Sequence, residues 1–221
     1  YYVWLSEIML QQTVVATVVP YFLKFVKRWP TLESLARANQ DQINQMWAGL
    51  GYYRRARGLR DCAQKLMSDY EGIFPQEEKE LQKLPGIGPY TSAAIAAIAF
   101  DKKANVVDGN VERVMARLYA EAQPLSKSKP KLKELAAHHV PNRRVGDYAQ
   151  ALMDLGATVC TPRSPKCGLC PWRKACKAHS KGKEESYPKK EAKKVKPLRY
   201  GTAFILVDPQ NRVYLEKRPE T

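Results

Sequence analysis

The sequence lacks a long hydrophobic run, which excludes a membrane-spanning helix of ordinary length. Its longest uninterrupted apolar stretch, Ala93 to Phe100, is far shorter than the roughly 20 residues that cross a bilayer. The sequence also lacks an initiator methionine and a signal peptide, so we expect a fragment whose targeting segment is missing. Before Lys181 it has no alternating polar and apolar stretch. The pattern therefore predicts an all-α domain there.

Acidic side chains are the minority among the charged residues. The chain has 37 Lys and Arg against 22 Asp and Glu, a net charge of +15. Because 44% of its 221 residues are apolar, one or two domains can still bury a sizeable core. This combination is typical of a folded protein that binds a polyanion, most often nucleic acid, and the alternative is an anionic membrane surface.

Cysteine is scarce outside one short segment. Four of the five cysteines have the spacing C-x6-C-x2-C-x5-C, namely Cys160, Cys167, Cys170 and Cys176. Such clustering favours a metal centre in a reducing compartment over a disulfide framework. Zinc sites usually pair their ligands as two short knuckles, which these gaps fit poorly. We predict one four-iron, four-sulfur cluster, whose role is structural or DNA-positioning because the protein supplies all four ligands.

The segment Leu84 to Asp108 is the clearest local signature. Its turn, LPGIGPYT, has glycines at Gly86 and Gly88 and precedes a predicted helix of small apolar residues. Free N–H groups of such a turn can bind a phosphate oxygen, although an ordinary helix start has the same pattern. The segment ends in VVDGNV, which places a carboxylate after two apolar residues. A phosphate site followed by a placed acid suggests chemistry on a nucleic-acid backbone or sugar.

A second acid lies near the N-terminus, where Val3 to Val19 has helical periodicity and is apolar on nearly every side. If Glu7 faces the apolar neighbours on this helix, burial raises its pKa and prepares the carboxyl group to donate a proton. If it lies at the helix edge, it faces solvent. The helical wheel leaves both positions open.

The turn GLGYYRRARGLR breaks the helical pattern with glycines, two tyrosines and several arginines. The aromatic residues are Tyr52 and Tyr53, and the arginines are Arg54, Arg55, Arg57 and Arg60. Arginines beside exposed rings fit phosphate contact combined with base stacking or wedging. A solvated basic face over two core tyrosines fits the same composition.

Taken together, SEIMLQQT, GLGYYRRAR, LPGIGPYTSAAI, VVDGNVERV, LGATVC and the four-cysteine loop resemble the adenine DNA glycosylase (MutY) family, over residues 1 to about 180. The resemblance implies the two-subdomain helix-hairpin-helix glycosylase fold for residues 1–180. Residues 181–199 are lysine-rich and predict a linker. Strands predicted at 202–207 and 212–218 resemble the start of that family's α/β Nudix-like domain, which recognises 8-oxoguanine, so 200–221 is expected to be its incomplete beginning.

The chemistry that the resemblance implies is hydrolysis of the N-glycosidic bond of adenine mispaired with 8-oxoguanine or guanine. The base must leave the stack of double-stranded DNA first. Glu7 matches the acid that protonates adenine N7, and Asp108 matches the carboxylate that stabilises the oxocarbenium-like sugar. Asn110 matches a residue supporting the acid and water, and Gln150 matches a reader of the adenine edge.

The same resemblance assigns DNA contacts. Gln12 and Tyr52 match residues that fill the gap and wedge the opposite strand, and the turn glycines Gly86 and Gly88 together with Arg54 are expected at the DNA backbone. We expect a monomer without membrane attachment. Its expected compartment is the bacterial cytoplasm at the nucleoid, or the nucleus or mitochondrion in a eukaryote.

Tyr90 separates this reading from the similar endonuclease III group, which acts on oxidised pyrimidines. In that group a lysine at this place forms a Schiff base with the sugar, which a phenol cannot do. We therefore predict a monofunctional glycosylase, and the alternatives are an endonuclease III-like glycosylase and lyase, or a non-catalytic DNA-binding module. The sequence departs from the family in two places: an LPWR motif is missing, and Glu112 stands where some relatives have lysine. Without that motif we expect the fragment to be less active. Without most of the C-terminal domain we expect it to discriminate 8-oxoguanine from guanine less well.

Overall fold

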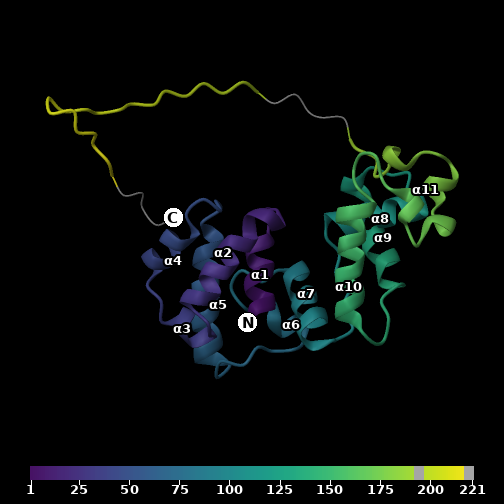
Figure 1. Ribbon diagram of the computed structural model, residues 1–221, viewed down its shortest axis with the longest axis horizontal. Helices are drawn as coiled ribbons and strands as arrows, with labels where there is room; N and C mark the ends of the chain where they lie inside the picture. Colours follow the sequence, from purple (N-terminus) through teal and green to yellow (C-terminus); the bar gives the residue numbers. More distant parts are fainter. Residues whose placement is uncertain (192–196, 217–221) are drawn as a thin grey trace. The chain divides into compact units, whose positions relative to one another are not determined.

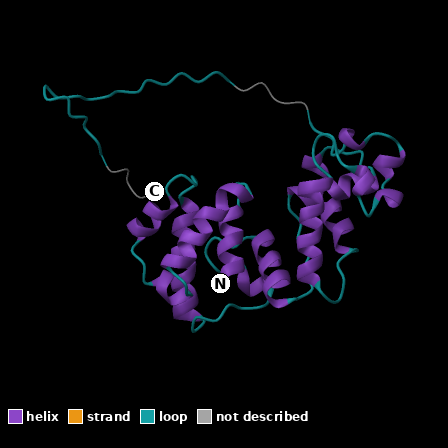
Figure 2. Cartoon of the chain, in the orientation of Figure 1, coloured by secondary structure: helices purple, strands orange, loops and turns teal. Residues whose placement is uncertain are grey.

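The computed structural model describes residues 1–191 and 197–216 (Figure 1). One compact unit comprises residues 1–191, and a second begins at residue 192. Within the described residues every regular element is a helix (Figure 2), which confirms the all-α prediction for the first unit. The α-helices are α1 (Tyr2–Leu10), α2 (Val15–Arg28), α3 (Leu32–Ala36), α4 (Gln40–Trp47), α5 (Arg54–Asp69), α6 (Glu78–Leu81), α7 (Pro89–Phe100), α8 (Gly109–Tyr119), α9 (Leu125–Ala137), α10 (Val145–Asp154) and α11 (Lys177–Ser180). A π-helix, η1 (Leu155–Val159), and three 3-10 helices, η2 (Cys167–Leu169), η3 (Arg173–Ala175) and η4 (Glu184–Ser186), complete the set.

The helices of the first unit surround two hydrophobic cores. The larger core lies among α1 to α7 and includes the side chains of Trp4, Phe25 and Trp47. The smaller core lies among α8, α9 and α10, with Met115 and Leu132 fully buried. Figure 1 shows α1 to α7 on one side of this unit and α8 to α11 on the other. The site described below lies where these two groups of helices meet.

Helix α7 joins the two groups because it packs against both α1 and α10. Its residues from Thr91 to Ala97 are all buried, and most of them are alanines. Small side chains let the neighbouring backbones come close. On α10, a Cβ added to Gly146 would lie 2.7 Å from the carbonyl oxygen of Ala97. The apolar run from Ala93 to Phe100, which is too short to cross a membrane, thus forms most of the helix that joins the two groups.

The prediction of one continuous helix from Val3 to Val19 is wrong. Helix α1 ends at Leu10 and α2 begins at Val15. Between them Gln12 has a left-handed backbone, with φ of 58°, which interrupts the helical hydrogen-bond pattern. The carbonyl groups left free at the end of α1 accept hydrogen bonds from Arg55 of α5. Periodicity could not reveal this break because the residues on both sides of it are apolar.

The first unit extends past residue 180, where the linker was expected to begin. The buried guanidinium of Arg117 donates to the carbonyl oxygen of Tyr187 at 3.1 Å. The amide of Leu125 donates to the carbonyl oxygen of Lys189 at 2.9 Å. These bonds hold residues 181–191 against α8 and α9, so the unit ends at Glu191.

The second unit has little regular structure in its described part, residues 197–216. One antiparallel bridge pairs Val207 with Val213. The turn between them is closed by Asp208, whose Oδ1 accepts from the amides of Gln210 and Arg212 at 2.9 Å. Over their described positions the strands predicted at 202–207 and 212–218 are not formed beyond this single bridge, and positions 217 and 218 lie outside the described residues. In the parts of the chain that the structure describes, no helix has the length and apolarity to cross a membrane.

Candidate active site

Glu7 is buried in the face that α1 presents to α7, with only 7% of its surface exposed. Desolvation is the main cause that raises the pKa of its carboxyl group above the ordinary value. The negative charge of Asp108 raises that pKa further, whereas a hydrogen bond with Tyr90 lowers it. Of the two positions that the wheel left open, the structure has the buried one. A carboxyl group in this environment retains its proton closer to neutral pH and can act as an acid.

Tyr90 lies in the first turn of α7, near both carboxyl groups. Its hydroxyl is hydrogen-bonded to Glu7 and donates to the sulfur of Met153 on α10 at 3.3 Å. Burial raises the pKa of Tyr90, and the charges of Glu7 and Asp108 raise it further. The phenol therefore stays protonated and serves as a donor beside the acids. These mutual effects place Glu7, Tyr90 and Asp108 in one site built from α1, α7 and the start of α8.

Asp108 is the N-cap residue of α8. Its Oδ1 accepts from the amide of Val111 at 2.7 Å, and its Oδ2 accepts from the side-chain amide of Asn110 at 2.8 Å. The positive end of the helix and two donors thus favour a negative charge here. Because both carboxylate oxygens are held, the group has one fixed orientation. It is suited to stabilise a positive charge that develops in the site.

A chain of hydrogen bonds connects Asp108 with the cysteine loop. Arg113 Nη2 donates to Asn110 Oδ1 at 2.9 Å and to the carbonyl oxygen of Gly156 at 2.6 Å. Its Nε donates to the carbonyl oxygen of Cys160 at 2.8 Å. The sequence prediction did not include Arg113. The signal was its position three residues after Asn110, on the same face of α8.

Gly156, in the π-helix that follows α10, packs closely against Asn110. An added Cβ would lie 2.6 Å from Asn110 Cβ and 3.1 Å from its backbone, which is closer than nonbonded carbon atoms approach. We expect Gly156→Ala to lower the free energy of unfolding by about 1–3 kcal/mol, as overpacking does, measured by urea denaturation. Gly109→Ala is the matched control, because nothing lies within 4 Å of its Cβ position. Equal stability of the two variants would contradict this expectation.

The phosphate-binding turn predicted at LPGIGPYT has the required backbone form. Gly86 has a left-handed φ of 76°, and a Cβ added to it would lie 3.8 Å from Gly58 Cα on α5, which is ordinary van der Waals contact. Gly88 is the N-cap residue of α7, and no side chain caps this end. Both glycines are exposed. The backbone of these two glycines is therefore accessible to an anion at the start of α7.

Gln12 and Tyr52 lie on two neighbouring turns and share an unusual backbone conformation. Both have positive φ, 58° and 49°, and both side chains are exposed. Arg54 is also exposed at the start of α5. By contrast Arg55, which the sequence grouped with it as a phosphate contact, donates to main-chain carbonyls beneath the two turns. Arg55 therefore serves these two turns, a role that neither interpretation of the sequence included.

Gln150 is not in contact with the acids. Its side-chain amide donates to the carbonyl oxygen of Gly146 within α10 at 3.1 Å, and it lies one turn before Met153, the residue that accepts from Tyr90. Its assignment as a reader of the base stays a prediction. Glu112, the other position in doubt, forms an ion pair with Lys129 of α9 at 3.1 Å, so it serves the contact between two helices.

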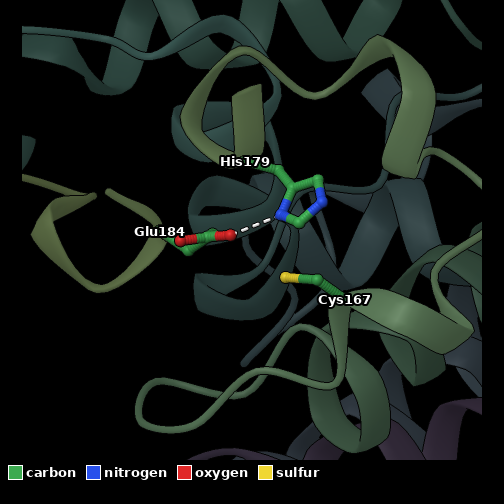
Figure 3. Close-up of side chains that lie close together, drawn as sticks. All are labelled: Cys167, His179 and Glu184. Carbon is green, nitrogen blue, oxygen red and sulfur yellow. Dashed lines mark hydrogen bonds and ion pairs between the residues drawn. The ribbon is translucent and has the colours of Figure 1, made fainter. Parts of the chain in front are cut away.

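The four cysteines of the loop line one small cavity, together with Arg117, Val159, Arg173, His179 and Glu184. None of them forms a disulfide. Among the described residues, the ligand atoms that lie mutually within 4.8 Å belong to Cys167, His179 and Glu184 (Figure 3). The four thiols as a set are therefore spread more widely than the sulfur ligands of one zinc ion, which lie about 3.8 Å apart for Zn–S bonds of ~2.3 Å.

Arg117 provides a second test of what this cavity accepts. It is 2% exposed, and its donors reach main-chain carbonyls and the sulfur of Cys160, at 3.3 Å. A buried cation that is bonded to neutral carbonyls leaves positive charge facing the thiols. An iron–sulfur cluster with four thiolate ligands carries negative charge. The residues present thus fit such a cluster.

The chain matches the HhH-GPD superfamily of base excision DNA repair proteins over residues 5–163. Residues 160–176 match the iron–sulfur binding domain of endonuclease III. An adenine DNA glycosylase of Rattus norvegicus is 49% identical over 184 residues, which are 82% of this chain and 36% of the relative. That of Buchnera aphidicola subsp. Acyrthosiphon pisum is 38% identical over 222 residues, 100% of this chain and 63% of the relative. The chain thus spans about a third of the rat relative's length.

Solved structures share the fold. A thermostable thymine-DNA glycosylase has a TM-score of 0.74 and 32% identity, over 82% of this chain and 84% of that one. An endonuclease III in a non-covalent DNA complex has a TM-score of 0.69 and 23% identity, over 81% of this chain and 84% of that one. At this lower identity the second likeness concerns the fold alone.

Proposed function

Because the chain belongs to the HhH-GPD superfamily of base excision DNA repair proteins, we propose that it is the catalytic part of an adenine DNA glycosylase. Its substrate is adenine opposite 8-oxoguanine or guanine in double-stranded DNA, and it hydrolyses the N-glycosidic bond. The observation that supports this most strongly is a buried acid with a raised pKa, Glu7, that shares one site with the fixed carboxylate of Asp108. Two carboxyl groups in unlike environments suit an acid and a cation stabiliser.

In the proposed reaction Glu7 gives its proton to N7 of an extruded adenine. The bond between adenine N9 and the sugar C1′ then breaks, and its electron pair leaves with the base as neutral adenine protonated at N7. Loss of the N7 proton and uptake of one at N9 then give the ordinary tautomer. The sugar becomes an oxocarbenium-like cation that Asp108 stabilises. A water molecule adds to C1′ and loses a proton, which leaves an abasic site.

The surrounding residues fit the handling of DNA. The first turn of α7, with Gly86 and Gly88, binds a backbone phosphate. Gln12 and Tyr52 enter the duplex from their two turns and occupy the space that the extruded base leaves. Arg54 contacts a phosphate, which contributes affinity but no sequence preference.

The cysteine loop is an iron–sulfur binding domain, and Cys160, Cys167, Cys170 and Cys176 hold one four-iron, four-sulfur cluster. When bound, the cluster supplies a negatively charged, redox-capable centre held by four protein ligands. The protein's own part is to fold the loop around it and to link the loop to the active site through Arg113. We assign the cluster a structural role because the proposed hydrolysis transfers no electrons. We further propose that residues 200–221 begin a Nudix-like domain.

Product analysis on two duplexes tests the function. The substrate has a single adenine opposite 8-oxoguanine, and a second duplex has an oxidised pyrimidine in its place. We expect strand breaks on the first duplex only after alkali, since a monofunctional enzyme leaves an abasic site that alkali cleaves. Breaks on the second duplex without alkali would support the endonuclease III-like alternative. Tight, salt-sensitive binding without base release would support a binding module.

Tyr90 gives a gain-of-function test for the monofunctional assignment. A lysine at this position would stand beside Asp108 and within reach of C1′, where its amine can attack the sugar and form a Schiff base. We expect Tyr90→Lys to form a covalent protein–DNA adduct on borohydride reduction, visible as a shifted band on a denaturing gel. Tyr90→Phe, which has no nucleophile, is the control. An active, folded lysine variant without adducts would count against the proposed place of the sugar.

A further inference from the structure

The turn between α1 and α2 and the turn before α5 share one half-buried cation. Arg55 of α5 donates from Nη1 to the carbonyl oxygens of Met9 and Gln11, at 2.8 and 2.5 Å. From Nη2 it donates to Thr13 Oγ1 at 3.1 Å and to the carbonyl oxygen of Leu50 at 3.2 Å. One guanidinium group therefore binds both turns at once.

These bonds flank the two exposed residues with left-handed backbones. Two of the partners from the first turn, Gln11 and Thr13, are the residues immediately before and after Gln12. On the second turn Leu50 and Gly51 precede Tyr52, and the carbonyl oxygen of Gly51 accepts from Arg55 at 3.4 Å. The guanidinium carbon also lies 5.7 Å from the centre of the Tyr52 ring, which is within cation–π range.

Left-handed backbone at a residue other than glycine is strained and persists only where its surroundings hold it. Gln12 and Tyr52 have exposed side chains, and their own packing cannot supply the restraint. Arg55 supplies it, because its planar group fits several acceptors at once. Trp47 fixes the guanidinium from the core side, with its ring centre 5.2 Å away, and its indole nitrogen donates to the carbonyl oxygen of Gly51 at 2.9 Å.

We propose that Arg55 is a positioning residue that holds Gln12 and Tyr52 as one rigid two-pointed wedge, so that both enter the duplex together when the base is extruded. Only the entry of both residues into the duplex rests on the proposed function. The restraint of the two turns does not. A clamp of this kind lowers the conformational entropy that the two turns lose on binding. Lysine at position 55 keeps the charge, but its single ammonium group cannot bond to both turns in this planar arrangement.

The test compares Arg55→Lys with Arg60→Lys. Arg60 is the matched control because it lies on the same helix and donates to a single carbonyl, that of Ala38, at 3.0 Å. The duplex has 2-aminopurine next to a 2′-fluoro-adenine opposite 8-oxoguanine, so that fluorescence reports extrusion without hydrolysis. We expect at least a ten-fold smaller extrusion constant for Arg55→Lys and less than a two-fold change for Arg60→Lys.

A double-mutant cycle separates positioning from a merely structural role. Gln12→Ala and Tyr52→Ala are each measured with arginine and with lysine at position 55. Positioning predicts that both alanine substitutions reduce extrusion strongly beside arginine and less than two-fold beside lysine. Effects of equal size in both backgrounds would overturn the proposal. Thr13→Val removes the bond from Arg55 and a longer one to the carbonyl oxygen of Gln11. It should reduce extrusion in the same direction and supports the test if Arg55→Lys folds poorly.

Hydrogen exchange on the free protein tests the clamp without DNA. We expect Arg55→Lys to increase amide exchange at residues 11–13 and 50–53 together, with Arg60→Lys unchanged there. Increased exchange in one turn alone, or in neither, would overturn the clamp. If wild type neither releases adenine nor extrudes it while both turns exchange together in Arg55→Lys, the proposed function fails and the clamp stands.

Discussion

Glu7→Gln is expected to abolish most adenine release, with a rate on the order of 10² to 10⁴ times lower, the range for loss of a general acid. Glutamine has nearly the same shape as the protonated carboxyl group, so it preserves packing in the buried site. It cannot give a proton to the base, however. The measurement is single-turnover release of adenine from the duplex with 8-oxoguanine, with enzyme in excess so that product release does not limit the rate.

The pH dependence of this rate provides a second readout. Desolvation raises the pKa of Glu7 above the ordinary value of 4.5, so the acid is protonated and active below the raised pKa. The rate should fall as the pH rises through that value. Glu7→Gln should lose this limb of the profile. The fold responds in the same direction: stability that comes from the protonated group is complete below pH 4.5 and is lost as the pH rises through the raised pKa.

Glu121→Gln is the matched control for this substitution. Glu121 is 6% exposed, nearly as buried as Glu7, but a hydrogen bond from Lys131 holds the pKa of its carboxyl group below the ordinary value. Its replacement should cost stability without reducing the single-turnover rate. A Glu7→Gln enzyme as fast as the control, with an unchanged pH profile, would remove Glu7 from the proposed role.

The sequence predicted the all-α fold of the first unit. For Glu7 it left two positions open, one buried and one exposed. Helical periodicity shows which face of α1 is apolar, but α1 is apolar almost all round. The approach of α7 therefore decides where Glu7 points. Resemblance to a family added roles that periodicity could not, and those roles stay predictions. The structure shows that Glu7, Tyr90 and Asp108 interact with one another.

Arg55, Arg113 and Arg117 show why the supporting residues were missed. On composition, an arginine in a basic chain predicts a phosphate contact. Each of these three instead binds main-chain carbonyl oxygens from distant segments. Those carbonyls become free only where helices end or loops fold back, and no local pattern in the sequence predicts that. The misplaced end of α1 has the same origin, since its last carbonyls are held by Arg55.

Asp108→Asn tests the second carboxylate, and it isolates charge from fold. Asparagine is as good an N-cap as aspartate, so the bond to the amide of Val111 is retained. An asparagine side chain has only one oxygen, so the bond from the side-chain amide of Asn110 is lost. The loss of one hydrogen bond lowers the free energy of unfolding by about 1 kcal/mol. The negative charge that would stabilise the oxocarbenium-like sugar disappears. We expect single-turnover adenine release to fall on the order of 10² to 10³-fold, as when other groups directed at transition-state charge are removed.

Asp108→Ala separates the two roles further. It removes the cap as well as the charge, so it should unfold more easily than Asp108→Asn, by about 0.5–2 kcal/mol, while its rate falls by a similar factor. If catalysis depended only on the cap geometry at α8, the asparagine variant would retain near wild-type activity and the alanine variant would not. Equal loss of rate with unequal loss of stability is the result that assigns Asp108 an electrostatic role, because both variants lack the charge and the bond to Asn110 while only the alanine variant lacks the cap.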